Sequence, residues 1–262
     1  MQWVDIGVNL PNSRLNIEPM LERATSAGVK QIILTGTDIT QSGQAAILTT
    51  DYPGQLFSTA GVHPHNAKDV DDDYLEALCH LAAMPQVVAI GECGLDFNRN
   101  FSPPAQQLRV FEQQLELASE LGLPVFLHER DAFEQQYSLL SKYRSQLVGG
   151  VVHCFTGDMA QMQAYLDLGL YIGITGWVCD PKRGHTLRAA VCELPLERLL
   201  LETDAPYLRP KTLGSEKIKG VDHNEPCYLP HIAHQLAALM QVKLTDIQQH
   251  SVNNSQQLFR IT

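Results

Sequence analysis

The sequence predicts an α/β protein that folds as a (β/α)8 barrel, the TIM barrel, in one domain over residues 1–262. Eight short apolar, β-branched runs alternate with amphipathic stretches of helical spacing, and about 260 residues is a typical length for this barrel. Such alternation indicates a parallel sheet that helices cover. An open doubly wound sheet is the alternative, but the chain has no glycine-rich phosphate-binding fingerprint.

The predicted strands are short runs rich in valine, isoleucine, leucine and aromatic residues, which favour extended backbone. No shift of composition between them marks a domain boundary. In chain order they are WVDIGV (3–8), QIILTG (31–36), LFSTAGV (56–62), VVAIGE (87–92), PVFLH (124–128), GVVHC (150–154), YIGIT (171–175) and RLLLET (198–203).

The intervals between these runs are predicted to be helices. The clearest lies within 105–122, where one face carries apolar residues three or four positions apart: Leu108, Phe111, Leu115, Ala118 and Leu121. Gly28, Gly122 and Gly169 each follow a predicted helix and precede a strand. Glycine is favoured there because the residue after a helix often adopts a left-handed conformation.

The charge balance excludes one class of nucleic-acid partner. The formal net charge is −10, which argues against a protein that coats nucleic acid through a broad basic face. A nuclease remains compatible with it, because bound divalent cations can supply positive charge at the phosphate.

The sequence also predicts a cytoplasmic protein with no membrane partner. The stretch MQWVDIGVNL lacks the basic and apolar regions of a secretion signal, and no apolar run approaches the roughly 18 residues of a membrane span. The six cysteines show no paired CxxC spacing, so we expect reduced thiols.

Polar side chains stand at the ends of six predicted strands, and in a barrel these ends converge on the face that holds the active site. They are Asn9, His63, Glu92, His128, His153 and Asp204. Three histidines and two carboxylates at one point predict a metal site, with Asp204 as a general base for the attacking water. Taken singly, each histidine has a structural alternative as a hydrogen-bonded buried residue, and Asp204 has one as a helix cap.

Several sequence blocks resemble those of the TatD-type metal-dependent deoxyribonucleases, which are amidohydrolase-like barrel hydrolases. They are ordered and spaced as in that family, and they extend over essentially the whole chain: GVHPH (61–65), GECGLDF (91–97), HERDA (128–132), HCFTG (153–157), ETDAPYL (202–208), NEP (224–226) and NNSQQLF (253–259). The details are most similar to bacterial members. The resemblance implies a Mg2+-dependent 3′–5′ exonuclease that acts on single-stranded DNA and RNA.

The resemblance also assigns roles to the residues that match the family motifs. Glu92, His128 and His153 match the central metal ligands. Asp204 matches the acid that ligates metal and orients water, and His63 matches a histidine that touches substrate phosphate or metal-bound water.

Three further residues are predicted substrate contacts. His65 is the second histidine of HPH, with a structural role as its alternative, and Asn224 belongs to the NEP block. Arg130 has a guanidinium fork that suits phosphate oxygens, with a surface salt bridge as the alternative.

The chain departs from the family at its first strand. Most members open with Asp-x-His-x-His, whereas DIGVN at 5–9 places Gly7 and Asn9 at the two histidine positions. Asn9 offers a carbonyl oxygen, a weak ligand that suits Mg2+ better than Zn2+. We therefore expect one metal position to be weakened, to be rich in water, or to fill only when substrate phosphate is present. Histidine and carboxylate ligands alone favour Zn2+ or Mn2+, whereas the resemblance favours Mg2+.

Two further features bear on substrate. The segment 208–226 is mildly basic through Arg209, Lys211, Lys217 and Lys219, and it either steers a phosphate backbone or is an ordinary solvated loop. Aromatic residues near strand ends could stack on unpaired bases or belong to the core: Phe97, Phe155, Trp177 and Tyr207.

Two other functions stay open on the sequence alone. One is a barrel hydrolase of a small amide or ester, since metal-water chemistry is transferable. The other is a non-catalytic nucleic-acid-binding protein, which the absent histidines at Gly7 and Asn9 motivate. We expect a monomer, and processing of damaged 3′ ends is a hypothesis that the exonuclease resemblance suggests.

Overall fold

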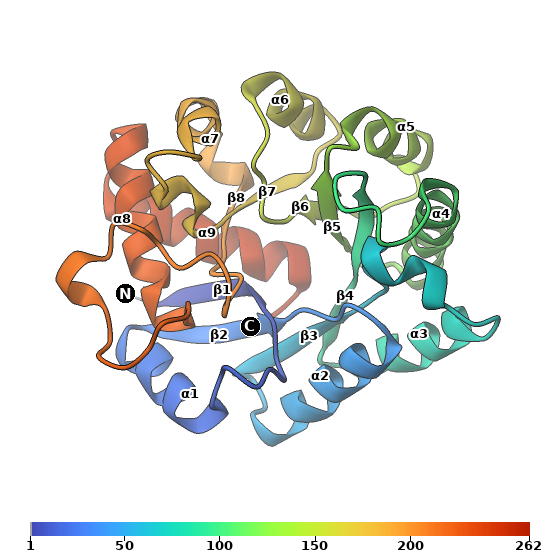
Figure 1. The fold of residues 1–262 in the computed structure, drawn as a ribbon, viewed down its shortest axis with the longest axis horizontal. Helices are drawn as coiled ribbons and strands as arrows, with labels where there is room; N and C mark the ends of the chain where they lie inside the picture. The colour runs from blue at the N-terminus through green and yellow to red at the C-terminus, as the bar shows by residue number, and fades with distance from the viewer. Residues whose placement is uncertain (1) are drawn as a thin grey trace.

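The computed structural model describes residues 2–262 and confirms the predicted barrel. Eight parallel strands pair in chain order and form a ring with helices outside it (Figure 1). The strands are β1 (Trp3–Val8), β2 (Val29–Leu34), β3 (Leu56–Ala60), β4 (Val87–Asp96), β5 (Val125–Arg130), β6 (Gly150–Val152), β7 (Tyr171–Ile174) and β8 (Leu199–Leu201).

The helices fill the intervals between strands, as the spacing predicts. They are α1 (Ile17–Ser26), α2 (Ile39–Asp51), α3 (Tyr74–Ala82), α4 (Pro104–Leu121), α5 (Phe133–Tyr143), α6 (Met159–Asp167), α7 (His185–Ala190), α8 (Leu229–Met240) and α9 (Leu244–Phe259). Short 3-10 helices cover Pro64–Asp69, Gly176–Cys179, Val191–Glu193, Leu196–Arg198, Gly214–Glu216 and Pro226–Tyr228. Among residues 2–262, no helix is both long enough and apolar enough to cross a membrane.

Helix ends follow the sequence expectation. Gly28, Gly122 and Gly169 have φ values of 89°, 62° and 73°, the left-handed conformation that glycine adopts without strain. On α4 the predicted face is buried at its centre, but Leu121 is 36% exposed because the helix ends there and the chain turns away at Gly122.

The barrel closes at the carboxyl ends of its strands. Backbone hydrogen bonds from Asn9 N–H to Ala205 O (2.8 Å) and from Asp204 N–H to Gly7 O (2.9 Å) join β1 to the segment after β8. This closure places position 9 beside position 204, although they are far apart in the sequence.

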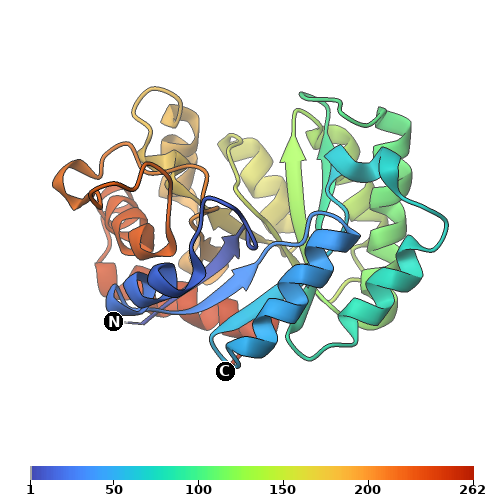
Figure 2. The ribbon, with the colours of Figure 1, turned by 60° about the horizontal axis from the view of Figure 1, so that its bottom comes forward.

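The opposite end of the barrel is filled by apolar side chains. The last turn of α9 and the residues after it supply Leu258, Phe259 and Ile261, which pack against residues of the strands: Val4, Ile6, Ile33, Val88, Ala89, Phe126, Val151, Tyr171 and Leu200. Both termini lie at this end, whereas the long loops that follow the strands lie at the other (Figure 2). Among residues 2–262, this apolar packing fills one end of the barrel, and the catalytic cavity opens at the other, where the strands end.

Strand β4 is longer than predicted. It continues past Glu92 to Asp96, with a register shift against β5 between Gly91 and Cys93. Gly91 and Gly94 have φ values of 138° and 137°, and a Cβ at either position would collide with a carbonyl oxygen of β5. These two glycines let β4 lie close against β5 while it carries two carboxylates to the open end of the barrel.

Candidate metal and catalytic site

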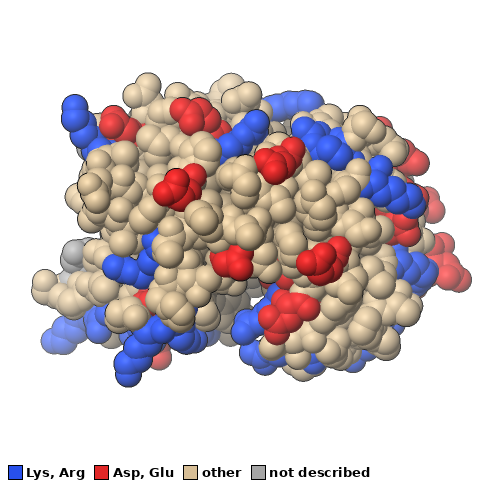
Figure 3. Space-filling view, turned by 90° about the horizontal axis from the view of Figure 1, so that it is seen from above, with Lys and Arg blue, Asp and Glu red and all other residues tan. Residues whose placement is uncertain are grey.

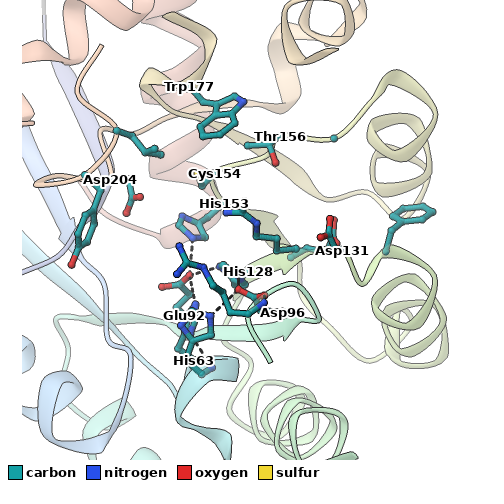
Figure 4. A pocket seen from close by; sticks show the side chains of 18 of the residues that line it. His63, Glu92, Asp96, His128, Asp131, His153, Cys154, Thr156, Trp177 and Asp204 are labelled. Carbon is teal, nitrogen blue, oxygen red and sulfur yellow. Dashed lines mark hydrogen bonds and ion pairs between the residues drawn. The ribbon is translucent and has the colours of Figure 1, made fainter. Parts of the chain in front are cut away.

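A cavity of about 1160 Å³ opens at the carboxyl ends of the strands (Figure 4). All six predicted strand-end residues line it: Asn9, His63, Glu92, His128, His153 and Asp204. Each comes from the carboxyl-terminal part of a different strand or from the residues that follow it, so the barrel topology brings these side chains together.

Glu92 lies at the centre of a histidine cluster. Its Oε1 atom is 2.8 Å from His153 Nε2, 2.9 Å from His128 Nδ1 and 3.4 Å from His63 Nε2. Burial opposes ionisation of this carboxyl group, which is only 6% exposed, but the surrounding imidazoles outweigh burial and hold the pKa of Glu92 well below its usual value. Glu92 is therefore a carboxylate.

The donor set of this cluster fits a divalent cation. His63, Glu92 and His128 each offer one ligand atom, and the three atoms lie within 4.8 Å of one another. Imidazole nitrogen and carboxylate oxygen are ligands of Zn2+, Mn2+ and, for the oxygen, Mg2+. Burial lowers the pKa of His63 to about 4, so its imidazole is neutral at pH 7 and has a lone pair to share.

His153 is held on both ring nitrogens. Its Nε2 faces Glu92, and its Nδ1 lies 3.1 Å from Oε2 of Glu202, a fully buried carboxylate whose Oε1 accepts the Cys154 N–H. Burial disfavours the imidazolium, but the two carboxylates raise the pKa of His153 well above its usual value. With Nδ1 held by this outer carboxylate, Nε2 would be oriented to bind a metal that displaces its proton.

A second outer carboxylate, Asp96, orients two other histidines. Its Oδ2 lies 2.8 Å from His65 Nε2 and 3.4 Å from His128 Nε2, and its Oδ1 accepts the backbone N–H groups of Asn98 and Arg99. Burial opposes its ionisation, but these hydrogen bonds lower the pKa of Asp96 below its usual range.

Sequence reasoning missed both outer carboxylates. It assigned metal or catalytic roles to one polar residue after each apolar run, whereas Asp96 lies four residues beyond Glu92 and Glu202 lies two before Asp204. The available signal was their place inside the GECGLDF and ETDAPYL blocks.

Asp204 and Asn9 form a pair across the barrel closure. Asn9 Nδ2 donates to Asp204 Oδ1 at 2.8 Å and to Ala205 O at 3.2 Å. Both acceptors are oxygens, so the amide nitrogen must face them, and Asn9 holds Asp204 in place. Burial raises the pKa of Asp204 to about 7. No helix begins directly after Asp204, which removes the capping alternative.

The predicted substrate contacts differ in their surroundings. His65 and the exposed Arg130 line the cavity. Asn224 is fully buried instead: its Nδ2 donates to Thr203 O at 2.7 Å, and its Oδ1 accepts the Glu225 N–H at 3.0 Å. The structure therefore does not bring Asn224 to the cavity, because both ends of its amide tie down the loop after β8.

The glycine at position 7 makes room for Glu202. A Cβ on Gly7 would collide with Glu202 Oε2, and that carboxylate can move only by losing its hydrogen bonds to His153 and Cys154. We expect Gly7→Ala to lower the free energy of unfolding by about 1–3 kcal/mol, as overpacked cores do. Urea denaturation measures it.

Gly43→Ala is the matched control for this substitution. Gly43 lies within α2, where an added Cβ meets only Leu81 Cδ2 at 4.0 Å. The same change should raise the free energy of unfolding there by about 0.5–1 kcal/mol, because alanine favours helix. Equal effects of the two substitutions would contradict the role of Gly7.

Comparison with known proteins agrees with this geometry. A family model described as TatD related DNase matches residues 4–260. A relative from Edwardsiella piscicida named 3′-5′ ssDNA/RNA exonuclease TatD is 50% identical over 260 residues, which cover 98% of this chain and 99% of the relative. A relative of the same name from Salmonella typhimurium is 51% identical over 89% of each chain.

Solved structures give the same result. The TatD homolog YJJV from Escherichia coli is 29% identical with a TM-score of 0.89, and covers 99% of this chain and 98% of its own. An uncharacterized amidohydrolase from Saccharomyces cerevisiae shares the fold, with a TM-score of 0.81 at 22% identity over 99% of this chain and 100% of its own. The parallel eight-stranded barrel is thus confirmed.

Proposed function

Because this chain belongs to the TatD-related DNase family, we propose that it is a metal-dependent 3′–5′ exonuclease that hydrolyses phosphodiester bonds of single-stranded DNA and RNA. The observation that carries the proposal is the convergence of three imidazoles on one oxygen of Glu92, inside a cavity wide enough for a nucleotide. The family implies a divalent metal, and the donor set fits one.

The ion would be held by Glu92, His63, His128, His153 and Asp204. When bound, it supplies positive charge to the phosphate oxygens and makes a water more acidic. Asp204 accepts the proton of the attacking water, since Asn9 holds one of its carboxylate oxygens and leaves the other for the proton. Arg130 and His65 bind phosphate oxygens at the cavity wall.

The proposal includes finer points. Mg2+ is the ion in use, and Mn2+ and Zn2+ are substitutes to be tested. The first strand offers only the amide oxygen of Asn9, which binds metals weakly and suits Mg2+ better than Zn2+. The enzyme acts as a cytoplasmic monomer. Processing of damaged DNA ends is one use of this activity, and unchanged survival of a deletion strain under DNA-damaging stress would count against it.

The experiment is digestion of a 5′-labelled single-stranded oligonucleotide with Mg2+. We expect a ladder that shortens from the 3′ end. An Asn9→His lane shows whether the absent imidazole tunes the rate. An oligonucleotide left intact in both Mg2+ and Mn2+ would refute the nuclease, and small esters and amides would become the next substrates.

A further inference from the structure

A second cavity, of about 410 Å³, adjoins the catalytic one. The two share four lining residues: Trp177, Arg183, Tyr207 and Leu208. Together they make a continuous groove that leads from the histidine cluster to the loop after β8, drawn in orange in Figure 1. The second cavity thus adds space beyond the catalytic cavity.

We propose that the second cavity, here called the flanking groove, binds the nucleotides on the 5′ side of the scissile phosphodiester. The proposal rests on the proposed exonuclease function. An enzyme that removes nucleotides from the 3′ end leaves all the rest of the strand on the 5′ side, so that side needs an open path out of the catalytic cavity.

Charge supports this path. Four cationic side chains line the flanking groove: Arg14, Arg183, Arg209 and Lys211. Its two carboxylates are already paired, Asp180 with Arg183 at 2.8 Å and Asp222 with Arg14 at 3.8 Å. In a chain with a formal net charge of −10, this groove is a local excess of positive charge that attracts a phosphate backbone.

The side of the catalytic cavity away from the flanking groove is less suitable for binding a phosphate backbone. Its lining carries four carboxylates, Glu129, Asp131, Glu134 and Asp158, against two arginines, Arg99 and Arg130. Figure 4 shows Asp131 across the cavity from Asp204. On the side of the molecule seen in Figure 3, basic and acidic side chains are interspersed over most of the surface, and basic side chains gather at the lower left. A polyanion is therefore directed toward the flanking groove.

Aromatic side chains mark the boundary between the two cavities. Tyr207 is 50% exposed there, although large aromatic rings are usually buried. Arg183 lies 4.4 Å above the ring of Trp177, which places a cation beside a stacking surface. Rings of this kind stack on any unpaired base, whatever its identity. The groove thus suits single strands without sequence preference.

The test measures binding separately from hydrolysis. Fluorescence anisotropy in EDTA gives the affinity for 5′-fluorescein-labelled dT12 and dT3 across a salt series. Wild type should bind dT12 at least tenfold more tightly than dT3. The double variant Arg14→Gln, Lys211→Gln should bind dT12 about tenfold more weakly. The slope of log K against log salt should become shallower by about 1.4, because each lost phosphate contact in a single strand contributes about 0.7. Tyr207→Ala should lower the affinity for dT12 about tenfold.

The control pair is Lys30→Gln with Lys243→Gln, which makes the same change of charge. Lys30 is the second residue of β2, and Lys243 precedes α9, so both lie exposed away from the open end of the barrel. This pair should leave affinity and salt slope unchanged. Equal binding of dT12 and dT3 by wild type, or a groove variant that behaves like the control pair, would overturn the flanking groove.

Hydrolysis of dT12 by wild type with Mg2+ separates the two proposals. If wild type cleaves dT12 and the groove variants bind it as wild type does, only the proposal for the flanking groove is overturned. Absence of cleavage overturns the exonuclease, and with it the assignment of the groove to a 5′ flank. Cleavage together with the length and salt dependence above supports both.

Discussion

Glu92→Ala should reduce kcat on single-stranded DNA by at least about a thousandfold and abolish binding of a divalent metal. The substitution removes the one oxygen on which His63, His128 and His153 converge. Without it, three neighbouring imidazoles have no negative charge between them, and a cation has no carboxylate at the centre of the site. Single-turnover digestion and isothermal titration with Mn2+ measure the two losses.

The matched control is Glu134→Gln, which removes a carboxylate from the exposed rim of the same cavity. It should keep kcat within about threefold and bind Mn2+ normally. Circular dichroism shows whether Glu92→Ala folds, and Glu92→Gln provides a second variant of nearly unchanged volume. Retention of a tenth or more of the activity by a folded Glu92 variant would contradict the central role of this residue.

The positions of the strand-end residues were predictable for a physical reason. Parallel strands that alternate with helices all end on one side of the sheet, so a polar residue after an apolar run marks the open end of the barrel. Glu92 and His128 could be placed together in this way without any knowledge of pairing distances.

The residues that escaped prediction depend on details that periodicity does not carry. Asp96 reaches the cavity only because Gly91 and Gly94 let β4 continue beyond its apolar run. Asn224 looked like a substrate contact, but the direction of its amide depends on a loop whose path the sequence does not specify.

The departure at the first strand illustrates the same limit. The absence of two histidines predicted a weakened metal position, and the structure shows what surrounds the two residues that replace them. Glu202 occupies the space over Gly7, and Asn9 binds Asp204. Glycine at position 7 and asparagine at position 9 therefore do more than remove two ligands. They also affect how His153 and Asp204 are positioned. We infer that restoring histidine at position 7 requires a smaller residue at 202.

Asp204→Asn should lower kcat by about a hundredfold to ten-thousandfold, the range of a lost general base. An amide cannot accept the proton of the attacking water, yet its oxygen can still accept the hydrogen bond from Asn9 Nδ2. The substitution also removes the cost of ionising a buried carboxyl group, so the melting temperature should stay the same or rise. Digestion rates and thermal unfolding of the same preparation test both expectations.

Asp131→Asn on the opposite wall is the control, since Asn98 Nδ2 bonds Asp131 Oδ2 at 2.7 Å and the isosteric amide keeps most of that contact. It should digest DNA within about threefold of wild type. The kcat of Asn9→Ala should lie between those of Asp204→Asn and Asp131→Asn, about tenfold below wild type. This variant keeps the Asp204 carboxyl group but removes its hydrogen bond from Asn9. A low rate for Asp204→Asn that coincides with a lower melting temperature would assign Asp204 to the stability of the barrel closure, and a rate near that of wild type would transfer the role of base to another residue.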